Sequence, residues 1–395
     1  MCAGKRAEAP VPGTMEDSDR RLLVPDLARG VMLLLIAAAN AHYWFRQDPN
    51  ASETYESLVS NLLHLLVDGR AYPLFALLLG FGLTRIAHGS VQASLAAGLD
   101  RKQAERRATA LLRRRGLWLL AFGAVHALVF TQDVLGVYGL VTVVVAGVVA
   151  SRRWRTALVS AVLVCTLSTS FLAAAGPEAV LARSHGLAAQ ALFDERLAGV
   201  AANLAIWTVA TPATALSSMV LPSALLGSWL AGRGLVEQPH RYRRGLSGVV
   251  LVGLVVPAAV LPVLWVSVGG TGVPARALIA WHQGLAGLLT GAAYLALVAL
   301  VVSHRAAGAG TLGRALAATG RRSLSAYLSQ TVLLALAAGA LRLCGVEALS
   351  LAWQMFVAAT VWSVSLPVCS LMERRGVQGP AERELRRLVA AGARR

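Results

Sequence analysis

The sequence is poor in charged residues and especially in lysine. Charged residues make up 14% of its 395 residues and hydrophobic residues 56%, against about 25% and about 45–50% in an average soluble domain. This composition excludes a disordered chain, a collagen and an ordinary soluble enzyme. Lys5 and Lys102 are the only lysines, so arginine carries nearly all of the formal net charge of +17.

Several signatures of nucleotide, metal and nucleophile chemistry are also missing. The sequence has no GxxxxGK[ST], HExxH, GxSxG or SxxK, which argues against a P-loop ATP-driven pump and the common intramembrane metalloprotease. Cys165, Cys344 and Cys369 stand singly in apolar runs and are predicted to be buried small hydrophobic residues, while Cys2 lies in a polar tail. We therefore predict no metal site and no certain cofactor.

Long apolar runs bounded by arginine, glycine or proline dominate the chain. A bilayer core about 30 Å thick is crossed by roughly 20 helical residues. Ten such runs predict an all-α, polytopic bundle of about ten transmembrane helices. The predicted spans are 27–45, 72–86, 111–130, 134–150, 157–175, 214–231, 245–268, 278–302, 324–343 and 349–372.

Three stretches are not simple spans. Leucines between 58 and 66 recur at helical spacing and predict an amphipathic helix ahead of the second span. The stretch 197–230 is too long for one span, so we predict a break at Thr211-Pro212 and interpret 197–210 as interfacial or re-entrant. Residues 87–109 form the longest polar segment between spans and are expected to be a loop.

The positive charge is divided unevenly along the chain, and this distribution predicts an orientation. If the N-terminus is cytoplasmic and each span crosses once, 31 of the 37 Lys and Arg residues lie in inward segments and six in outward ones. The positive-inside rule then predicts a cell-membrane protein with both termini cytoplasmic. The charge therefore calls for no nucleic-acid partner.

The predicted organisation is a single membrane domain between two tails. We expect a polar cytoplasmic tail over 1–22, a transmembrane domain over 23–373 and a basic cytoplasmic tail over 374–395. No cleavable signal peptide is expected, because the first 22 residues are polar and the first apolar run is of spanning length.

Polar residues inside the predicted spans are the candidates for a functional site, because an unpaired polar group in hydrocarbon is costly. His126 and Asp133 lie on adjoining antiparallel spans joined by a short turn. A carboxylate that orients an imidazole makes a general base, although such a pair also locks a helical hairpin without any catalysis. The residues expected at one depth near the outer boundary are Asn40, His42, His64, Asp68, His126, Asp133 and His282.

Further candidates lie at the span ends. Asp26 and Arg29, at spacing i, i+3, are expected to pair at the cytoplasmic boundary. Trp207 is interpreted as one of several tryptophans at the membrane interface. Helix packing explains the polar groups of the fourth and ninth spans as well as substrate binding does. The candidate substrate-binding residues are Asp26, Arg29, Asn40, Asp68, Arg70, Tyr138, Tyr327 and Gln330.

Five blocks of the sequence carry a family resemblance. They are RLLVPDLARGVMLLLIAAAN (21–40), DGRAYPLFALLLGFGLTR (68–85), 114–140 with its His126, Asp133 and Tyr138, GRRSLSAYLSQT (320–331), and GPAE (379–382) followed by Arg386. Together they resemble the bacterial YeiB-like family of multi-pass proteins, domain of unknown function 418. Residues 225–390 resemble the signature domain of that family. The resemblance implies no settled activity, and a transport role has been suggested for that family.

The first span is more distantly similar to the integral-membrane acyltransferase superfamily. Asp26, Arg29 and Gly30 fit that pattern, but Asn40 stands where the superfamily has a histidine. Because asparagine is no general base, acyltransferase chemistry requires His42 or His126 in its place.

These observations leave three functions open. The first is an acyltransferase-like protein that moves an acyl group from a cytoplasmic thioester such as acyl-CoA to a lipid or glycan near the outer leaflet. In this acyltransferase hypothesis His126 is the general base and Asp133 orients its imidazole. Asp26 and Arg29 shape the cytoplasmic entrance for the acyl donor. The second is a transporter or exporter of a small polar or lipidic solute, suggested by the predicted break near Pro212. The third is a non-catalytic scaffold. The expected partners are membrane lipids and a small-molecule or lipid substrate, and the oligomeric state stays open.

Overall fold

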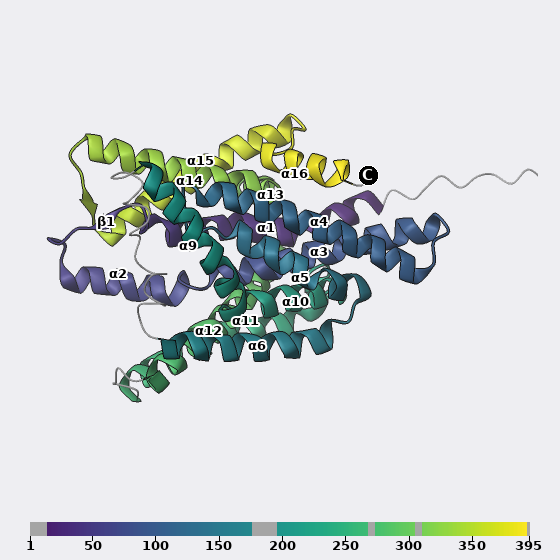
Figure 1. The fold of residues 1–395 in the computed structure, drawn as a ribbon, viewed down its shortest axis with the longest axis horizontal. Helices are drawn as coiled ribbons and strands as arrows, with labels where there is room; N and C mark the ends of the chain where they lie inside the picture. The colour runs from purple at the N-terminus through teal and green to yellow at the C-terminus, as the bar shows by residue number, and fades with distance from the viewer. Residues whose placement is uncertain (1–13, 176–195, 268–272, 305–309, 393–395) are drawn as a thin grey trace, which may run out of the picture.

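The computed structural model describes residues 14–175, 196–267, 273–304 and 310–392, and this part of the chain is almost entirely helical (Figure 1). Residues 1–13 and 393–395 of the two predicted tails lie outside it. The helices are α1 (Thr14–Ala41), α2 (Glu53–Leu66), α3 (Ala71–Ala96), α4 (Arg101–Ala127), α5 (Leu135–Ser151), α6 (Trp154–Ala175), α9 (Arg196–Ser217), α10 (Val220–Ala231), the 3-10 helix η1 (Pro239–Tyr242), α11 (Arg243–Ser267), α12 (Val273–His304), α13 (Thr311–Arg321), α14 (Ser323–Leu343), α15 (Leu351–Arg374) and α16 (Pro380–Ala391).

The predicted all-α helical bundle is confirmed. Eight stretches of helix in the described residues are long and apolar enough to cross a membrane: 23–41, 53–96, 157–174, 199–217, 239–260, 277–304, 323–343 and 351–374. The predicted spans 111–130 and 134–150 correspond to α4, which carries Arg113, Arg114 and Arg115, and to the shorter apolar helix α5. The number of ten membrane crossings stays a prediction.

Most helices run along the long axis of the molecule. In Figure 1 the first turns of α1 and the C-terminal helix α16 lie at the same end of the bundle. The two-residue strands β1 (Arg46–Gln47) and β2 (Ala348–Leu349) pair in parallel at the opposite end. The described starts and ends of the chain therefore share one side, the arrangement that an even number of crossings produces.

The predicted break at Thr211-Pro212 is wrong. Pro212 lies inside α9, which continues to Ser217, and the chain leaves helical structure only at Ser218 and Met219. The hydroxyls of Ser217 and Ser218 donate back to the carbonyl oxygens of residues 213 and 214. Such bonds offer the backbone an alternative to the helix and often bend it. The predicted span 214–231 is thus divided between α9 and α10.

The predicted loop 87–109 is also mostly helical. Helix α3 extends to Ala96 and α4 begins at Arg101. Gly98 provides the positive φ of the turn, and Asp100 forms a capping box with Gln103 that starts α4. Local capping therefore carries both helices beyond the apolar residues that the hydropathy pattern detects.

The amphipathic helix predicted ahead of the second span is present as α2. Tyr55, Leu58, Leu62 and Leu66 are all exposed and recur every three or four residues along it. Of the three described cysteines, Cys165 and Cys369 are buried as predicted, whereas Cys344 is exposed because it lies just beyond the last turn of α14.

Candidate functional site

His126 and Asp133 meet at the turn between α4 and α5. Nδ1 of His126 lies 2.8 Å from Oδ1 of Asp133, and the two side chains are 5% and 0% exposed. On the other side of the ring, Nε2 lies 3.0 Å from Oγ1 of Thr331 on α14. The imidazole of His126 therefore connects the carboxylate of Asp133 to a hydroxyl on a helix far along the chain.

Asp133 is also held by the main chain of α5. Its Oδ1 accepts the N–H of Leu135 at 3.1 Å and its Oδ2 accepts the N–H of Gly136 at 2.6 Å. The first amides of a helix have no partner within the helix, and negative charge is favoured beside them. The carboxylate thus satisfies the start of α5 and orients His126 at the same time.

Glycines let α4 and α5 approach closely enough for this contact. A Cβ added to Gly123 would lie 2.5 Å from Oδ2 of Asp133 and would also collide with the main chain of Gly136. Two turns away, an added Cβ on Gly116 would lie 2.7 Å from the carbonyl oxygen of Gly139. Any side chain at these positions would push the hairpin apart.

The hydrogen bonds determine which nitrogen of His126 carries a proton. Both oxygens of Asp133 accept N–H groups, and an ionised carboxylate has acceptors only. Nδ1 is therefore the donor to Asp133, and in the tautomer that is protonated there alone Nε2 accepts the hydroxyl proton of Thr331. A carboxylate, an imidazole and a hydroxyl in this order form the arrangement that activates a nucleophile.

Trp207 contacts Asp133, and its interpretation as a membrane-interface residue is wrong. Its Nε1–H donates to Oδ2 of Asp133 at 3.1 Å, and the side chain is buried. Gly136 leaves room for the indole, since a Cβ there would lie 2.5 Å from the ring. The sequence gives no sign of this contact, because the two residues are 74 positions apart.

Replacing Trp207 by phenylalanine is expected to lower the free energy of unfolding by about 1.5–3 kcal/mol, the range for a hydrogen bond to a charged group. The measurement is the unfolding of the purified protein in detergent. Trp281→Phe is the control, because Nε1 of Trp281 donates to the neutral oxygens of Thr166 and Ser170 and should cost about 0.5–1.5 kcal/mol. Equal losses would contradict a special contribution of the carboxylate.

Aromatic rings surround His126. The ring centroid of Tyr327 lies 5.1 Å away and that of Phe130 5.8 Å away. Tyr43 packs edge-on against Phe130, and His42 lies 4.2 Å from Tyr43. The alternative catalytic candidate His42 is therefore separated from His126 by two rings in this stack.

A cavity of about 260 Å³ adjoins Asp133. Its walls come from α3, α5, α9 and α10 and from the segments after α1, before α5 and before α10, and His126 is not part of them. The polar residues that line it are Tyr43, Tyr72, Thr131, Gln132, Asp133, Thr211, Thr214 and Ser218. The candidate Tyr138 lies beside this wall, where its hydroxyl donates to the carbonyl oxygen of Tyr72 at 3.0 Å.

The remaining outer candidates form separate contacts. His64 and Asp68 pair within α2 and the turn after it, with Nδ1 and Oδ2 2.6 Å apart. Arg70 is fully buried and donates to Oε1 of Gln283 at 3.1 Å, while its Nη2 has no partner among the described residues. Nε2 of His282 lies 3.1 Å from a carbonyl oxygen of α11. The structure thus brings His126 and Asp133 together, while the other histidines contact different groups.

Asn40, Tyr327 and Gln330 are all buried. The main-chain carbonyl oxygen of Asn40 accepts the N–H of Tyr43 at 3.2 Å, and the hydroxyl of Tyr327 accepts the main-chain N–H of Val134 at 3.4 Å. Neither amide atom of Gln330 has a hydrogen-bond partner in the described part of the chain. An unsatisfied buried group costs about 1–3 kcal/mol, so Gln330 keeps an unused polar side chain one residue from Thr331.

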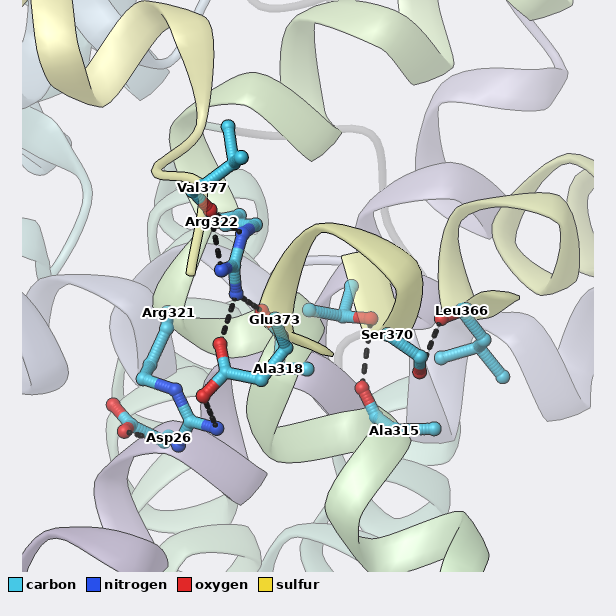
Figure 2. Close-up of polar contacts among 10 residues, drawn as sticks. Asp26, Ala315, Ala318, Arg321, Arg322, Leu366, Ser370, Glu373 and Val377 are labelled. Carbon is cyan, nitrogen blue, oxygen red and sulfur yellow. Dashed lines mark hydrogen bonds and ion pairs between the residues drawn. The ribbon is translucent and has the colours of Figure 1, made fainter. Parts of the chain in front are cut away.

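Asp26 and Arg29 belong to a charge network at the end of the bundle where α15 ends. Figure 2 shows the part of this network that Asp26, Arg321 and Glu373 form. Arg29 donates to Oδ1 of Asp26 at 3.2 Å, as their spacing predicts, and Arg321 donates to Oδ2 at 3.3 Å. Arg321 also reaches Glu373 at 2.7 Å. Burial lowers the pKa of Arg321, but its bonds and Coulombic attraction to Glu373 and Asp26 outweigh burial and raise it overall. The guanidinium of Arg321 is therefore charged at neutral pH.

Arg322 extends the network into the protein interior. Its Nε and Nη2 donate to the carbonyl oxygen of Val377 at 3.1 and 2.6 Å, and its Nη1 donates to that of Ala318 at 3.2 Å and to Glu373 (Figure 2). One guanidinium thus ties the turn between α13 and α14 to the segment that joins α15 to α16.

Helix α16 supplies the cap of α14. Oε1 of Glu382 accepts the N–H groups of Leu324 and Ser325 at 2.8 and 3.2 Å, and Oε2 accepts the hydroxyl of Ser325. A carboxylate at a helix N-terminus satisfies amides that lack partners and opposes the positive end of the helix dipole. The helix that carries Thr331 is therefore fixed at its start by Arg322 and Glu382.

Sequence reasoning missed four residues of these contacts: Thr331, Trp207, Glu373 and Glu382. Thr331 lies four residues after Tyr327, on the same face of a helix, and this spacing is the signal that could have identified it. Glu373 and Glu382 lie more than 50 positions from the groups that they bind, so spacing gives no comparable signal for them.

The comparisons with known proteins identify the C-terminal part of the chain. A family model described as "Protein of unknown function (DUF418)" matches residues 230–392. No curated protein and no solved structure matches the chain. The matched region contains Thr331, the Arg322 contacts and the Glu382 cap, whereas His126 and Asp133 lie before it. The distant similarity to integral-membrane acyltransferases finds no match and stays a prediction.

Proposed function

For a chain whose residues 230–392 match the DUF418 family model, we propose an acyl-transfer activity in which Asp133, His126 and Thr331 act as a catalytic relay. The observation that carries the proposal is the pair of distances on the imidazole, 2.8 Å to the carboxylate and 3.0 Å to the hydroxyl. The buried position of the three side chains keeps competing water away from them. The arginine distribution supports a location in the cell membrane with both termini cytoplasmic.

The proposed first step transfers the acyl group from a thioester, such as acyl-CoA, to Thr331. Nε2 of His126 takes the hydroxyl proton while Oγ1 attacks the carbonyl carbon, so that a C–O bond forms and the C–S bond breaks. His126 then gives its proton to the leaving thiolate, which departs as a free thiol. Asp133 stabilises the transient imidazolium of His126, and the Nδ1 proton stays on the imidazole ring.

The second step regenerates the protein. A hydroxyl of the lipid or glycan acceptor attacks the Thr331 ester, and His126 removes the proton of that hydroxyl. The acyl group passes to the acceptor, and His126 returns the proton to Oγ1 of Thr331. No metal or redox partner is needed for either step.

Asp26 and Arg29 receive a different interpretation from the predicted donor entrance. Arg29 donates to Asp26 and to the carbonyl oxygen of Leu78, and Arg321 also donates to Asp26. This favours a structural contribution of the pair. Gln330, with its unpaired amide next to Thr331, is the better candidate for contact with a substrate.

The test is covalent labelling of the protein itself, which requires no knowledge of the acceptor. The purified protein in nanodiscs is incubated with alkyne-tagged palmitoyl-CoA, and peptide mapping locates the label. We expect the label on Thr331, at least about 100-fold less of it in His126→Gln, none in Thr331→Val, and retention in Thr331→Ser. Thr142→Val is the matched control, because Thr142 is an equally buried threonine whose hydroxyl donates to Tyr138 within α5. Labelling that persists in Thr331→Val would disprove the relay.

A second candidate function is transport of a small polar solute, and the cavity beside Asp133 favours it. The cavity is bordered by Ser218, at the interruption between α9 and α10, and helix interruptions expose backbone groups to a bound solute. Proteoliposomes separate the two functions. Solute movement that follows a proton gradient without covalent change, in a protein that palmitoyl-CoA does not label, would support transport.

A further inference from the structure

An apolar-lined cavity lies far from His126 in the chain and is rimmed by arginine. It measures about 670 Å³ and is formed by the end of α10, η1, the start of α11 and the second half of α12. Its interior is apolar, with Leu226, Leu230, Leu246 and a row of small residues on α12 that includes Ala292, Ala296 and Ala299. This size is within the usual range of small-molecule and lipid sites.

The rim carries positive charge without acidic partners. Arg243 donates to the carbonyl oxygen of Ser303, whereas Arg241 and Arg244 are exposed and form no ion pair among the described residues. The nearest acidic side chain in this segment, Glu237, is already paired with Arg85 at 3.2 Å. Two guanidinium groups are thus left to bind an anion from outside the chain.

The position of the rim fits a membrane surface. A Cβ on Gly232, just after α10, would touch Arg152 of the turn between α5 and α6, so the two basic turns share one end of the bundle. Arg233 lies over the ring of Trp229, 5.0 Å from its centroid. Tryptophan and arginine side by side at a helix end are typical of the headgroup region of a bilayer.

We propose that this cavity binds one anionic phospholipid of the bilayer. Its acyl chain lies along the apolar wall of α10 and α12, and its phosphate is bound by Arg241 and Arg244, whose guanidinium groups form paired hydrogen bonds to phosphate. Basic pockets between membrane helices select anionic headgroups in the same way. This site is separate from the relay and does not depend on the proposed acyl transfer.

The test counts the lipids that the protein retains. The protein is placed in nanodiscs of equal amounts of phosphatidylglycerol and phosphatidylethanolamine, extracted in mild detergent and analysed by native mass spectrometry. Wild type should retain phosphatidylglycerol preferentially, and Arg241→Gln with Arg244→Gln should lower its retention about thirtyfold, given the usual contribution of two arginines near a headgroup. Arg374→Gln with Arg375→Gln removes the same charge from the end of α15 and should change nothing.

A charge-neutral variant checks the acyl half of the site. Val249 lines the cavity and is 42% exposed, so Val249→Trp fills the cavity without disturbing the core and should also release the lipid. Equal phosphatidylglycerol retention in the arginine variant and wild type would overturn the proposal. Equal loss of both lipids, or an acyl thioester bound in place of a phospholipid, would overturn it as well.

Discussion

Replacing Asp133 by leucine is expected to lower the free energy of unfolding by about 3–5 kcal/mol, the range for breaking a buried pair by removing one partner. The carboxylate is the acceptor for the N–H groups of Leu135 and Gly136, the indole of Trp207 and the imidazole of His126. Leucine has a similar volume but accepts none of these bonds, and the donors are too deeply buried to find water. Unfolding of the purified protein in detergent measures the loss.

Asp133→Asn separates the structural from the catalytic contribution of this carboxylate. Its remaining oxygen still accepts bonds from Gly136 and Trp207, so the expected loss of stability is only about 1–2 kcal/mol. Its amide, however, donates to Nδ1 of His126 and moves the ring proton to Nε2, which then no longer accepts the proton of Thr331. The variant should therefore fold but lose acyl labelling. If Asp133→Leu were within 1 kcal/mol of wild type, the carboxylate would not hold this part of the fold together.

Contacts between residues close in sequence were predictable, whereas those between distant segments were not. His126 and Asp133 are seven positions apart, and a short turn between two apolar helices brings them together. Thr331 is 205 positions from His126, and nothing in a single sequence determines which helix packs beside α4. The contact between His126 and Asp133 was therefore predicted, but the contact of His126 with Thr331 was missed.

The helices themselves followed from the apolar pattern, and the errors arose where local hydrogen bonds outweighed it. Pro212 was expected to end a helix, yet α9 continues past it for more than a turn. The true interruption lies at Ser218 and Met219, just after the hydroxyls of Ser217 and Ser218 donate to carbonyl oxygens of α9, bonds of a kind that often bend a helix. Helix α4 extends outside the apolar run because Asp100 and Gln103 cap it. Hydropathy does not record such bonds.

The charge network shows how a contact at the end of the bundle controls the position of the site. Arg322 fixes the start of α14, and Thr331 lies just over two turns further along the same helix. A shift of α14 along its axis would lengthen the 3.0 Å contact between Thr331 and His126. The family-matched region and the earlier helices are thus connected through α14, although Arg322 contacts none of the three relay residues directly.

Arg322→Met is therefore expected to lower both stability and acyl labelling. Methionine keeps the apolar stem but removes the bonds to the carbonyl oxygens of Val377 and Ala318 and to Glu373, at an expected cost of about 2–4 kcal/mol. Arg321→Met is the matched control: it shares Glu373 as a partner, but its side chain is 41% exposed against 7% for Arg322. A partly exposed ion pair contributes about 0–1 kcal/mol. Equal losses in the two variants would show that the ion pairs, and not the buried main-chain bonds of Arg322, hold the turn between α13 and α14.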